Sequence, residues 1–362
     1  MRKSALVTVL FAFIAVFSFA CGGTNIISPD VGPGTDGGLP DGSTPPADGG
    51  TTTCGSQLCA SSQTCVQNTV CVTTPVKEAE AYVPKAWPPS KVTIDLTCFA
   101  GDPKPSPGPA TVKIKACLST FGIAQNTEDL EIIYYDYTGG KIGSQIGVTV
   151  TATTTKERDC PNQGYYEISD IPTNKLLVRK VSCASDDTQC KTKFHTTYQY
   201  NIYLDAGMAK DGVITDIDEL DAEGNVVSDA TWKLIANTVG ISVASGHGVA
   251  AGRVRDCGRV NQVEYANVGT TTKPKRLVYF NGNEGKPKSE GSGTMSSDPD
   301  VGRTSTNVDG IYALIDLAPG DVFVQALAMS GGSVISVGDF TGQIFPDALT
   351  VLSFKGKRPA DE

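Results

Sequence analysis

Apolar and polar residues alternate along most of the chain after residue 90, and this period of two predicts β-strands. In the run 110–116, ATVKIKA, every second residue is apolar, as in a strand with one solvated face. β-branched and aromatic residues dominate the further runs 129–135, 147–153 and 198–204. Clusters of Gly, Asn, Asp and Pro separate these runs, so we expect an all-β fold.

A single segment has the pattern of a helix. Ser228 stands where an N-cap belongs, and the helical period extends to Thr238. Trp232, Ile235 and Val239 lie three and four residues apart and therefore share one face. We expect this short helix to use Trp232 as a core anchor.

Residues 21–90 are low in large apolar residues. Residues 21–53 are rich in Gly, Pro, Asp and Thr and predict a disordered linker, because they cannot bury enough apolar surface to fold. Four cysteines follow in a small module, residues 54–73, and a second linker covers residues 74–90. A segment as small as the module needs covalent staples to hold a shape.

An internal repeat indicates two related domains. The octapeptide 164–171, GYYEISDI, aligns with 310–317, GIYALIDL, and the alignment continues from 176–178 to 322–324. We expect tandem β-sandwiches at residues 91–204 and 241–362, joined by an acidic connector and the helix at 205–240. The polar connector offers little apolar surface, so the two sandwiches are expected to fold separately, and residues 240–362 to fold alone.

The second copy resembles a known family. The segments 252–256, 265–268, 306–314 and 317–326 are similar to the carboxypeptidase regulatory-like domain, whose fold is a seven-stranded sandwich of transthyretin-like or prealbumin-like topology. Asp309-Gly310 and Pro319-Gly320 are expected to form tight hairpin turns between its strands. The first copy lacks the Asp before Gly164, so its resemblance rests mainly on the repeat.

The N-terminus carries the pattern of an export signal. Arg2 and Lys3 precede the apolar stretch of residues 5–20, and Ala20-Cys21-Gly22 resembles the lipobox of bacterial lipoproteins, with Ser18 where Leu is usual. We expect a signal peptide at 1–20 and lipidation at Cys21. The resemblance implies a lipid-anchored protein of the outer membrane, facing the periplasm or the cell surface. An ordinary signal peptide cut near Ala20 is the alternative.

Ten cysteines remain after Cys21, in a chain directed to an oxidising compartment, and predict up to five disulfides and no zinc. We expect the four cysteines of the module to pair with one another, and Cys183 to pair with Cys190 across a short polar loop. Three pairings stay open for four further cysteines. The module cysteines are Cys54, Cys59, Cys65 and Cys71, and those with open pairing are Cys98, Cys117, Cys160 and Cys257.

Candidate chemistry is sparse. His195 and His247 are the only histidines, and neither has the Glu three residues later that a zinc carboxypeptidase needs. HExxH and GxSxG motifs are absent. The acidic stretch from Asp205 to Glu223 is interpreted as a solvated connector, because Ala230 stands where a calcium loop requires Glu. We therefore expect a protein that is not an enzyme and has no cofactor.

The net charge and the tyrosines of the chain indicate which classes of binding partner to expect. The net charge of −9, which becomes −11 without Arg2 and Lys3, argues against nucleic acid. Tyr198 and Tyr200 share a strand face and are candidates for facing a glycan. We expect non-catalytic modules acting in structure, adhesion or binding of an envelope protein. A carbohydrate-binding surface protein and an accessory subunit of an envelope hydrolase are the alternatives.

Overall fold

The computed structural model describes residues 52–99, 103–123, 125–153, 160, 163–216, 220–283, 286 and 298–359. The chain from Gly49 to Glu362 forms one compact unit. Strands dominate this unit, and the expected all-β class is confirmed. The signal peptide and almost all of the first linker lie outside the described residues.

The first half of the unit is a sandwich of two sheets. One sheet has the order β10-β7-β15-β12, with β14 also paired to β7. The strands of this sheet are β7 (Thr111–Phe121), β10 (Gly164–Pro172), β12 (Phe194–His195), β14 (Val213–Thr215) and β15 (Gly224–Ser228). The opposing strands are β8 (Glu131–Thr138), β9 (Lys141–Thr151), β11 (Leu176–Ser182) and β13 (Thr197–Tyr203). Because β14 and β15 come from the expected connector, that segment is part of a sheet rather than a solvated link.

The second half also opposes two sheets. A three-stranded sheet contains β18 (Asn267–Thr270), β22 (Gly320–Ser330) and β23 (Ser333–Ile344). The facing strands are β16 (Gly248–Arg255), β19 (Arg276–Phe280), β20 (Pro299–Asp300), β21 (Ile311–Leu317) and β24 (Leu349–Val351). Short strands extend this layer, namely β5 (Glu80–Tyr82), β6 (Lys91–Val92), β17 (Gln262–Glu264) and β25 (Phe354–Lys355).

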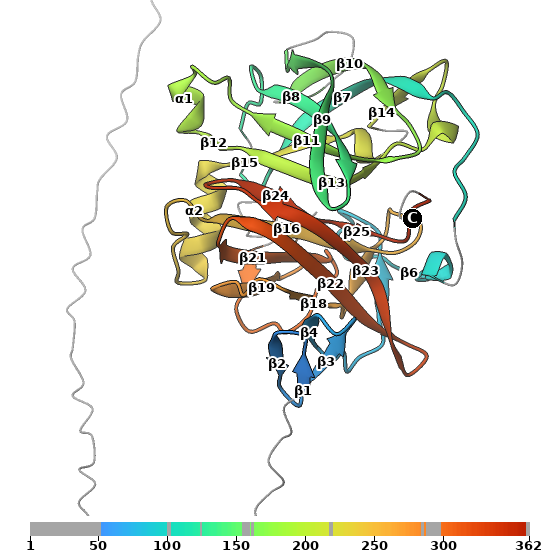
Figure 1. The fold of residues 1–362 in the computed structure, drawn as a ribbon, viewed down its shortest axis with the longest axis vertical. Coiled ribbons are helices and arrows are strands. Elements are labelled where there is room, and N and C mark those ends of the chain that lie inside the picture. The colour runs from blue at the N-terminus through green and yellow to red at the C-terminus, as the bar shows by residue number, and fades with distance from the viewer. Residues whose placement is uncertain are drawn as a thin grey trace, which may run out of the picture. The chain divides into compact units, whose positions relative to one another are not determined.

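The strand β24 joins the two halves. It pairs in parallel with β13 of the first half and with β16 of the second. One 13-stranded sheet therefore runs through both halves. Figure 1 shows β24 beside β16, with the first half above it.

The sheet is buried on both of its faces where the halves meet. Leu177 and Val181 of β11 face the core of the first half, whereas Leu176 and Val178 belong to the core of the second. The expectation that the halves share little apolar surface is therefore wrong. Their polar connector does not reveal this, because the apolar contact comes from strands on either side of it.

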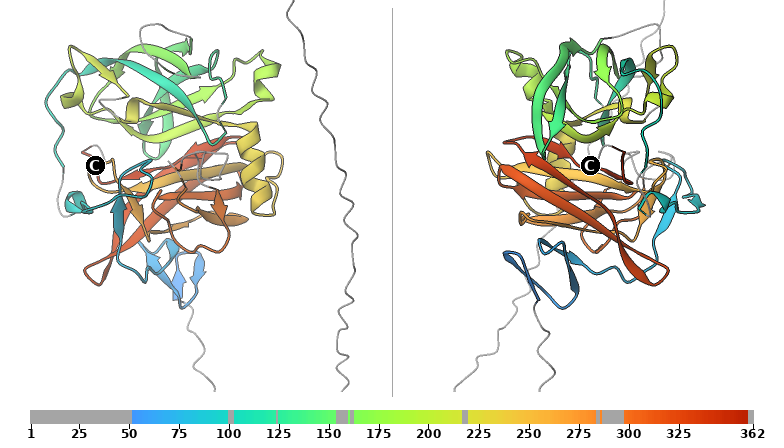
Figure 2. Two further views of the ribbon diagram at one scale, coloured as in Figure 1. Left: turned by 180° about the vertical axis from the view of Figure 1, so that it is seen from behind. Right: turned by 45° about the vertical axis from the view of Figure 1, so that its right-hand side comes forward.

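The helix α2 (Asp229–Thr238) lies where the sequence predicts it. Ser228 Oγ accepts a hydrogen bond from Thr231 N at 3.2 Å, which is the expected N-cap. Trp232 and Ile235 pack against a third apolar cluster on the outer side of β16, β19 and β21. Figure 2 shows α2 from behind, at the side of the sheet. The remaining helices are short, namely α1 (Thr188–Lys191), η1 (Thr97–Phe99), η2 (Ala206–Met208) and η3 (Leu220–Ala222).

Two small hairpins form the Cys-rich module. β1 (Thr52–Cys54) pairs with β2 (Gln57–Cys59), and β3 (Gln63–Val66) pairs with β4 (Val70–Thr73). The following segment, predicted as a linker, supplies β5, which pairs with β17 of the second half. Along the chain, β5 and β6 belong to the second half, β7 to β15 form the first half, and β16 to β25 complete the second half. The first half is an insertion into the second.

The internal repeat has a structural counterpart. β10 and β21 occupy equivalent positions, and each contains an Asp with positive φ, Asp170 at 62° and Asp316 at 63°. Each ladder shifts register at this Asp, as β-bulges do. The expected hairpin turns are wrong, however. β21 and β22 lie in different sheets, so Pro319-Gly320 crosses the sandwich, and Asp309-Gly310 closes a turn that only precedes β21.

Candidate functional site

The predicted glycan-facing tyrosines lie in the seam between the halves. Tyr200 is only 1% exposed, and Tyr198 is half-buried with its ring stacked on Phe345 at 3.9 Å between centroids. The two side chains share a face, as expected, but β23 and the segment after it cover that face. Tyr200 is therefore not accessible to a glycan.

Other aromatic side chains complete this seam. Tyr137 from β8 stacks on Phe340 from β23 at 4.9 Å, and its hydroxyl donates to Thr341 O at 2.7 Å. Tyr200 makes edge contacts with both rings, at 6.0 and 6.2 Å. Paired rings in these geometries add to the stabilisation from burial. The tyrosine-rich strands of the first half thus fasten it to the second.

A buried ion cluster lies in the same seam. The Asp221 carboxylate accepts hydrogen bonds from Lys355, from Arg358 at 2.9 Å and from Tyr203 N at 3.0 Å. Asp221 and Arg358 are each 3% exposed. Burial alone raises the pKa of Asp221, but the nearby Lys355 and Arg358 cations outweigh it and lower the pKa below its usual range. Burial and the neighbouring Arg358 lower the pKa of Lys355 to about 8, against the opposing effect of Asp221.

A third buried cation, Arg179, binds the backbone beside this cluster. Arg179 is fully buried and donates to the hydroxyls of Tyr134 and Tyr166, at 2.8 and 3.0 Å, and to Ala222 O at 2.9 Å. Its guanidinium also bonds Gln199 Oε1 at 2.8 Å. Arg179 therefore fixes the loop that presents Asp221 to the second half.

A pair of carboxylates lies where β5 pairs with β17 of the second half. Glu80 on β5 opposes Glu264 on β17. Hydrogen bonds from Lys91 and Tyr82 lower the pKa of Glu80, whereas burial raises the pKa of Glu264. Pairs with pKa values moved apart are common in acid and base catalysis. Here Lys91 lies 2.7 Å from Glu80 and Arg303 lies 3.4 Å from Glu264, so each carboxylate has a cation beside it.

Each of the two histidines lies beside a carboxylate. His195 Nε2 lies 3.3 Å from Asp229 Oδ1, and its ring stacks on Trp232 at 4.3 Å. His247 Nδ1 lies 2.9 Å from Asp316 Oδ1. Within the described part of the chain, no Ser, Thr or Cys side chain is bonded to either imidazole.

One surface hollow of about 380 Å³ lies at the C-terminal end of α2. It is lined by Asn237, Gly240, Ile241, Ser242 and Lys275. Lys275 Nζ lies 3.7 Å from Asp316 and 3.4 Å from Ser242 O. The amide, hydroxyl and ammonium groups of this lining give the hollow a polar surface.

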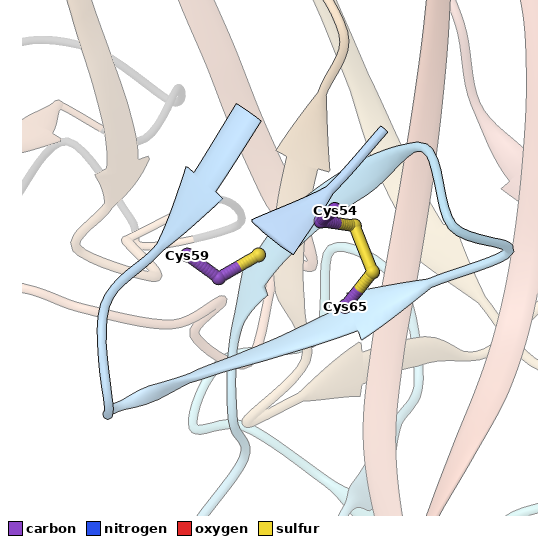
Figure 3. A group of neighbouring side chains, drawn as sticks. All are labelled: Cys54, Cys59 and Cys65. Atoms are coloured by element: carbon purple, nitrogen blue, oxygen red, sulfur yellow. A yellow bond between two sulfur atoms is a disulfide. The ribbon is translucent and has the colours of Figure 1, made fainter. Parts of the chain in front are cut away.

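The ten described cysteines form five disulfides. The module contains Cys54–Cys65 and Cys59–Cys71, and the predicted bridge Cys183–Cys190 is present. The four cysteines with open pairing form Cys117–Cys160 and Cys98–Cys257. Figure 3 shows Cys59 beside the Cys54–Cys65 bond. Three of the module sulfurs lie within 4.8 Å of one another, but they are bonded in disulfides, whereas a metal requires thiolates.

Several functional expectations find no test in this geometry. Cys21, the expected lipidation site, lies outside the described residues. Among the described residues, no helix combines the length and apolar composition that a membrane span needs.

The expectation of a solvated acidic stretch is wrong at Asp221, because this side chain is buried and Lys355 and Arg358 compensate its charge. Those two cations lie far away in sequence, so the sequence pattern gave no signal for the cluster.

Comparisons with known proteins give a limited picture. No protein-family model and no curated protein matches the chain. Among solved structures, it is similar to a leucine-rich repeat protein from Bacteroides thetaiotaomicron, with 11% identity, a TM-score of 0.18, and 69% of this chain and 27% of that chain covered. A streptococcal ancillary pilin shares 13% identity at a TM-score of 0.18, with 80% and 75% covered.

The minor pilin of Streptococcus agalactiae is a further similar structure. It shares 9% identity at a TM-score of 0.16, with 68% of this chain and 96% of that chain covered. The chain spans about a quarter of the length of the leucine-rich repeat protein. TM-scores this low do not define a shared fold, so function has to be argued from the molecule itself.

Proposed function

We propose that this chain is a non-catalytic protein of the cell envelope, anchored in the outer membrane by lipid on Cys21. The Gly-rich and Pro-rich residues 21–53 would hold the folded unit away from the bilayer as a flexible tether. The folded unit would then act in structure, adhesion or presentation of a binding surface to an envelope partner. The likeness of residues 248–327 to carboxypeptidase regulatory-like domains is consistent with such a module.

The observation that carries this proposal is the set of five disulfides. Two disulfides lie within the module, and two, Cys117–Cys160 and Cys183–Cys190, lie within the first half. The fifth links Cys98 to Cys257 at the base of the insertion. Disulfides persist in oxidising compartments and are rare in the cytosol. A chain with every described cysteine paired is therefore suited to the cell envelope.

The buried seam supports a rigid, non-catalytic role. Aromatic stacking, the Asp221 cluster and the parallel pairing of β24 hold the two halves together. His195 and His247 each lie beside a carboxylate, and Glu80 and Glu264 each lie beside a cation. A body of this kind can hold its surfaces in fixed positions, and the residues that the structure describes form no assembled reaction centre.

Lipidation is tested by Cys21→Ser. We expect the wild-type chain to incorporate labelled palmitate and to sediment with membranes, and the variant to lose the label and leave the membrane fraction. The double variant Cys183→Ser, Cys190→Ser keeps Cys21 and should stay labelled. Label that persists in Cys21→Ser would exclude this anchor.

The binding role is tested by a pull-down with residues 49–362, the compact unit. Envelope proteins and purified envelope glycans are offered separately. An envelope protein retained specifically by the folded unit, and not by a heat-unfolded sample, supports presentation of a binding surface. Retention of glycan alone would favour the carbohydrate-binding alternative, even though Tyr200 is buried.

A further inference from the structure

The disulfide at the base of the insertion differs from the other four in its burial. Each of the other bridges contains one cysteine that is at least nine-tenths buried, and these are Cys54, Cys59, Cys117 and Cys183. Cys98 and Cys257 are both half-buried, so each end of their bridge is in contact with solvent. A thiolate that breaks a disulfide has to reach one of its sulfurs, and exchange therefore depends on access.

Both sulfurs of this bridge accept hydrogen bonds from the backbone. Cys98 N donates to Cys257 Sγ at 3.0 Å, and Lys357 N donates to Cys98 Sγ at 3.2 Å. Gly356 allows the second bond, because its φ is 75° and an added Cβ would lie 2.8 Å from Cys98 Sγ. Among the described residues, hydrogen bonds to sulfur occur at this bridge alone.

The two donors lie where negative charge appears when the bridge opens. An external thiolate that attacks one sulfur expels the other as a thiolate, and hydrogen bonds to that thiolate favour its charged form. Cys98 N is placed to stabilise the thiolate of Cys257, and Lys357 N is placed to stabilise that of Cys98. Attack on either sulfur therefore has a donor ready for the leaving group.

The charges beside the bridge cancel. Two carboxylates and two cations are its neighbours in sequence, namely Asp95, Asp256, Arg259 and Lys357. Asp95 Oδ1 accepts hydrogen bonds from Thr97 N at 2.9 Å and from Thr97 Oγ1 at 2.7 Å. Asp256 Oδ2 accepts one from Asn261 Nδ2 at 3.0 Å. Each carboxylate thus has donors of its own, which leaves the backbone N–H groups to the sulfurs.

We propose that Cys98–Cys257 is a redox-active disulfide and that its reactant is a dithiol. One thiolate of the dithiol attacks Cys98 Sγ or Cys257 Sγ and forms a mixed disulfide, which the second thiol then resolves. The dithiol loses two electrons and two protons and becomes a disulfide, and Cys98 and Cys257 gain them as two thiols. The other four bridges stay closed under the same conditions.

Opening this bridge loosens the segment that leads into the first half. Besides the bridge, Asp95 is held to the turn between β16 and β17 by two hydrogen bonds, from Cys257 N to Asp95 O at 2.9 Å and from Asp95 N to Asp256 Oδ2 at 3.3 Å. The halves stay joined, because the pairing of β24 with β13 and β16 involves no cysteine. The bridge is thus a local clasp on a seam that does not depend on it.

Timed reduction of residues 22–362 tests the proposal. The folded chain is treated with dithiothreitol, new thiols are blocked with N-ethylmaleimide at intervals, and the labelled peptides are quantified by mass spectrometry. We expect Cys98 and Cys257 to be labelled at least about ten times faster than the cysteines of any other bridge. Equal rates at the five bridges, or label that appears first at another bridge, would overturn the proposal.

A second variant pair tests the donor at Cys98. Lys357→Pro removes the N–H that reaches Cys98 Sγ, whereas Lys357→Ala keeps it and removes only the ammonium group. With glutathione as the thiol, early samples are quenched in acid, and the mixed disulfide on Cys257 is compared with that on Cys98. We expect Lys357→Pro to lower this ratio relative to Lys357→Ala, because attack on Cys257 expels the Cys98 thiolate. An equal ratio in the two variants would overturn the role of the N–H donors.

Hydrogen exchange measures the consequence of opening the bridge. In the reduced chain, we expect the amides of residues 94–99 to exchange faster, while those of β13 and β24 keep their protection. Loss of protection at β13 and β24 as well would contradict a local clasp, since the bridge would then hold the seam.

Discussion

At the scale of single residues, the unusual feature is charge in places that normally exclude it. Asp221, Arg179 and Arg358 are almost fully buried. Burying a charge costs free energy unless partners compensate, and the partners here come from both halves of the unit. Asp221 of the first half is compensated by Lys355 and Arg358 of the second, so separating the halves would leave these charges without their partners.

Asp221→Asn tests this function of the ion cluster. The substitution removes the carboxylate that Lys355 and Arg358 both contact, and loss of one member of a buried ion pair costs about 3–5 kcal/mol. We expect a fall of this size in the free energy of unfolding, measured in urea. Adding Lys355→Met removes one buried cation and should recover part of the loss. A double variant as unstable as the sum of both single variants would show that the two residues are not coupled.

Glu167 gives a pH dependence with a definite sign. Hydrogen bonds from Lys113 and Tyr165 lower its pKa from 4.5 to about 2. A lowered pKa in the folded state means that this carboxylate stabilises the protein above pH 4.5, and that its contribution disappears as the pH falls to about 2. We expect Glu167→Gln to flatten the fall in melting temperature over this interval. Lys113→Met should reproduce part of the effect, and an unchanged profile in Glu167→Gln would contradict the assignment.

At the scale of elements, the sequence predicts strands and the helix but not how they are connected. Period-two runs became β7, β8, β9 and β13, and the capping serine marks α2 correctly. These features are local, so they are visible in the sequence. Whether Pro319-Gly320 closes a hairpin or crosses between sheets depends on which strands pair, and pairing partners such as β24 and β13 are distant in sequence.

The turn before β21 can be tested at this scale. Gly310 has a φ of 63°, and a Cβ there would lie 2.6 Å from Val254 O. We expect Gly310→Val to cost about 1–3 kcal/mol from backbone strain, and more because of the clash. Gly212→Val is the matched control, because φ is 74° there but nothing lies within 4 Å of the added Cβ. Equal losses of melting temperature in the two variants would show that the clash is relieved.

At the scale of the whole molecule, the insertion of the first half into the second is the feature that the sequence did not predict. The repeat predicted two related sandwiches, but a repeat carries no information on contacts between its copies. The sequence suggested exposed functions for Tyr200 and for the acidic segment, but Tyr200 and Asp221 both contact the second half. A side chain on a strand surface looks the same in sequence whether it faces water or a second sheet.

The disulfide at the base of the insertion should stabilise more than a short one. Loop-closure entropy assigns about 5 kcal/mol to a loop of some 160 residues and about 2.5 kcal/mol to one of 8 residues. Cys98–Cys257 has a sequence separation of 159 and Cys183–Cys190 one of 7. We therefore expect Cys98→Ser, Cys257→Ser to lower the free energy of unfolding about twice as much as Cys183→Ser, Cys190→Ser. A smaller loss from the longer bridge would indicate residual structure in the unfolded chain.

The insertion also decides which fragments fold. Residues 240–362 lack β5, which pairs with β17, and β13, which pairs with β24. They also lack Cys98 and the rings of Tyr137 and Tyr200 that pack on Phe340. We expect this fragment to show no cooperative unfolding by circular dichroism and to bind a hydrophobic dye, whereas residues 49–362 unfold in one transition. The opposite result would be a cooperative, β-rich transition of the short fragment near the melting temperature of residues 49–362. It would show that the second half folds on its own and that contacts with the first half add little to its stability.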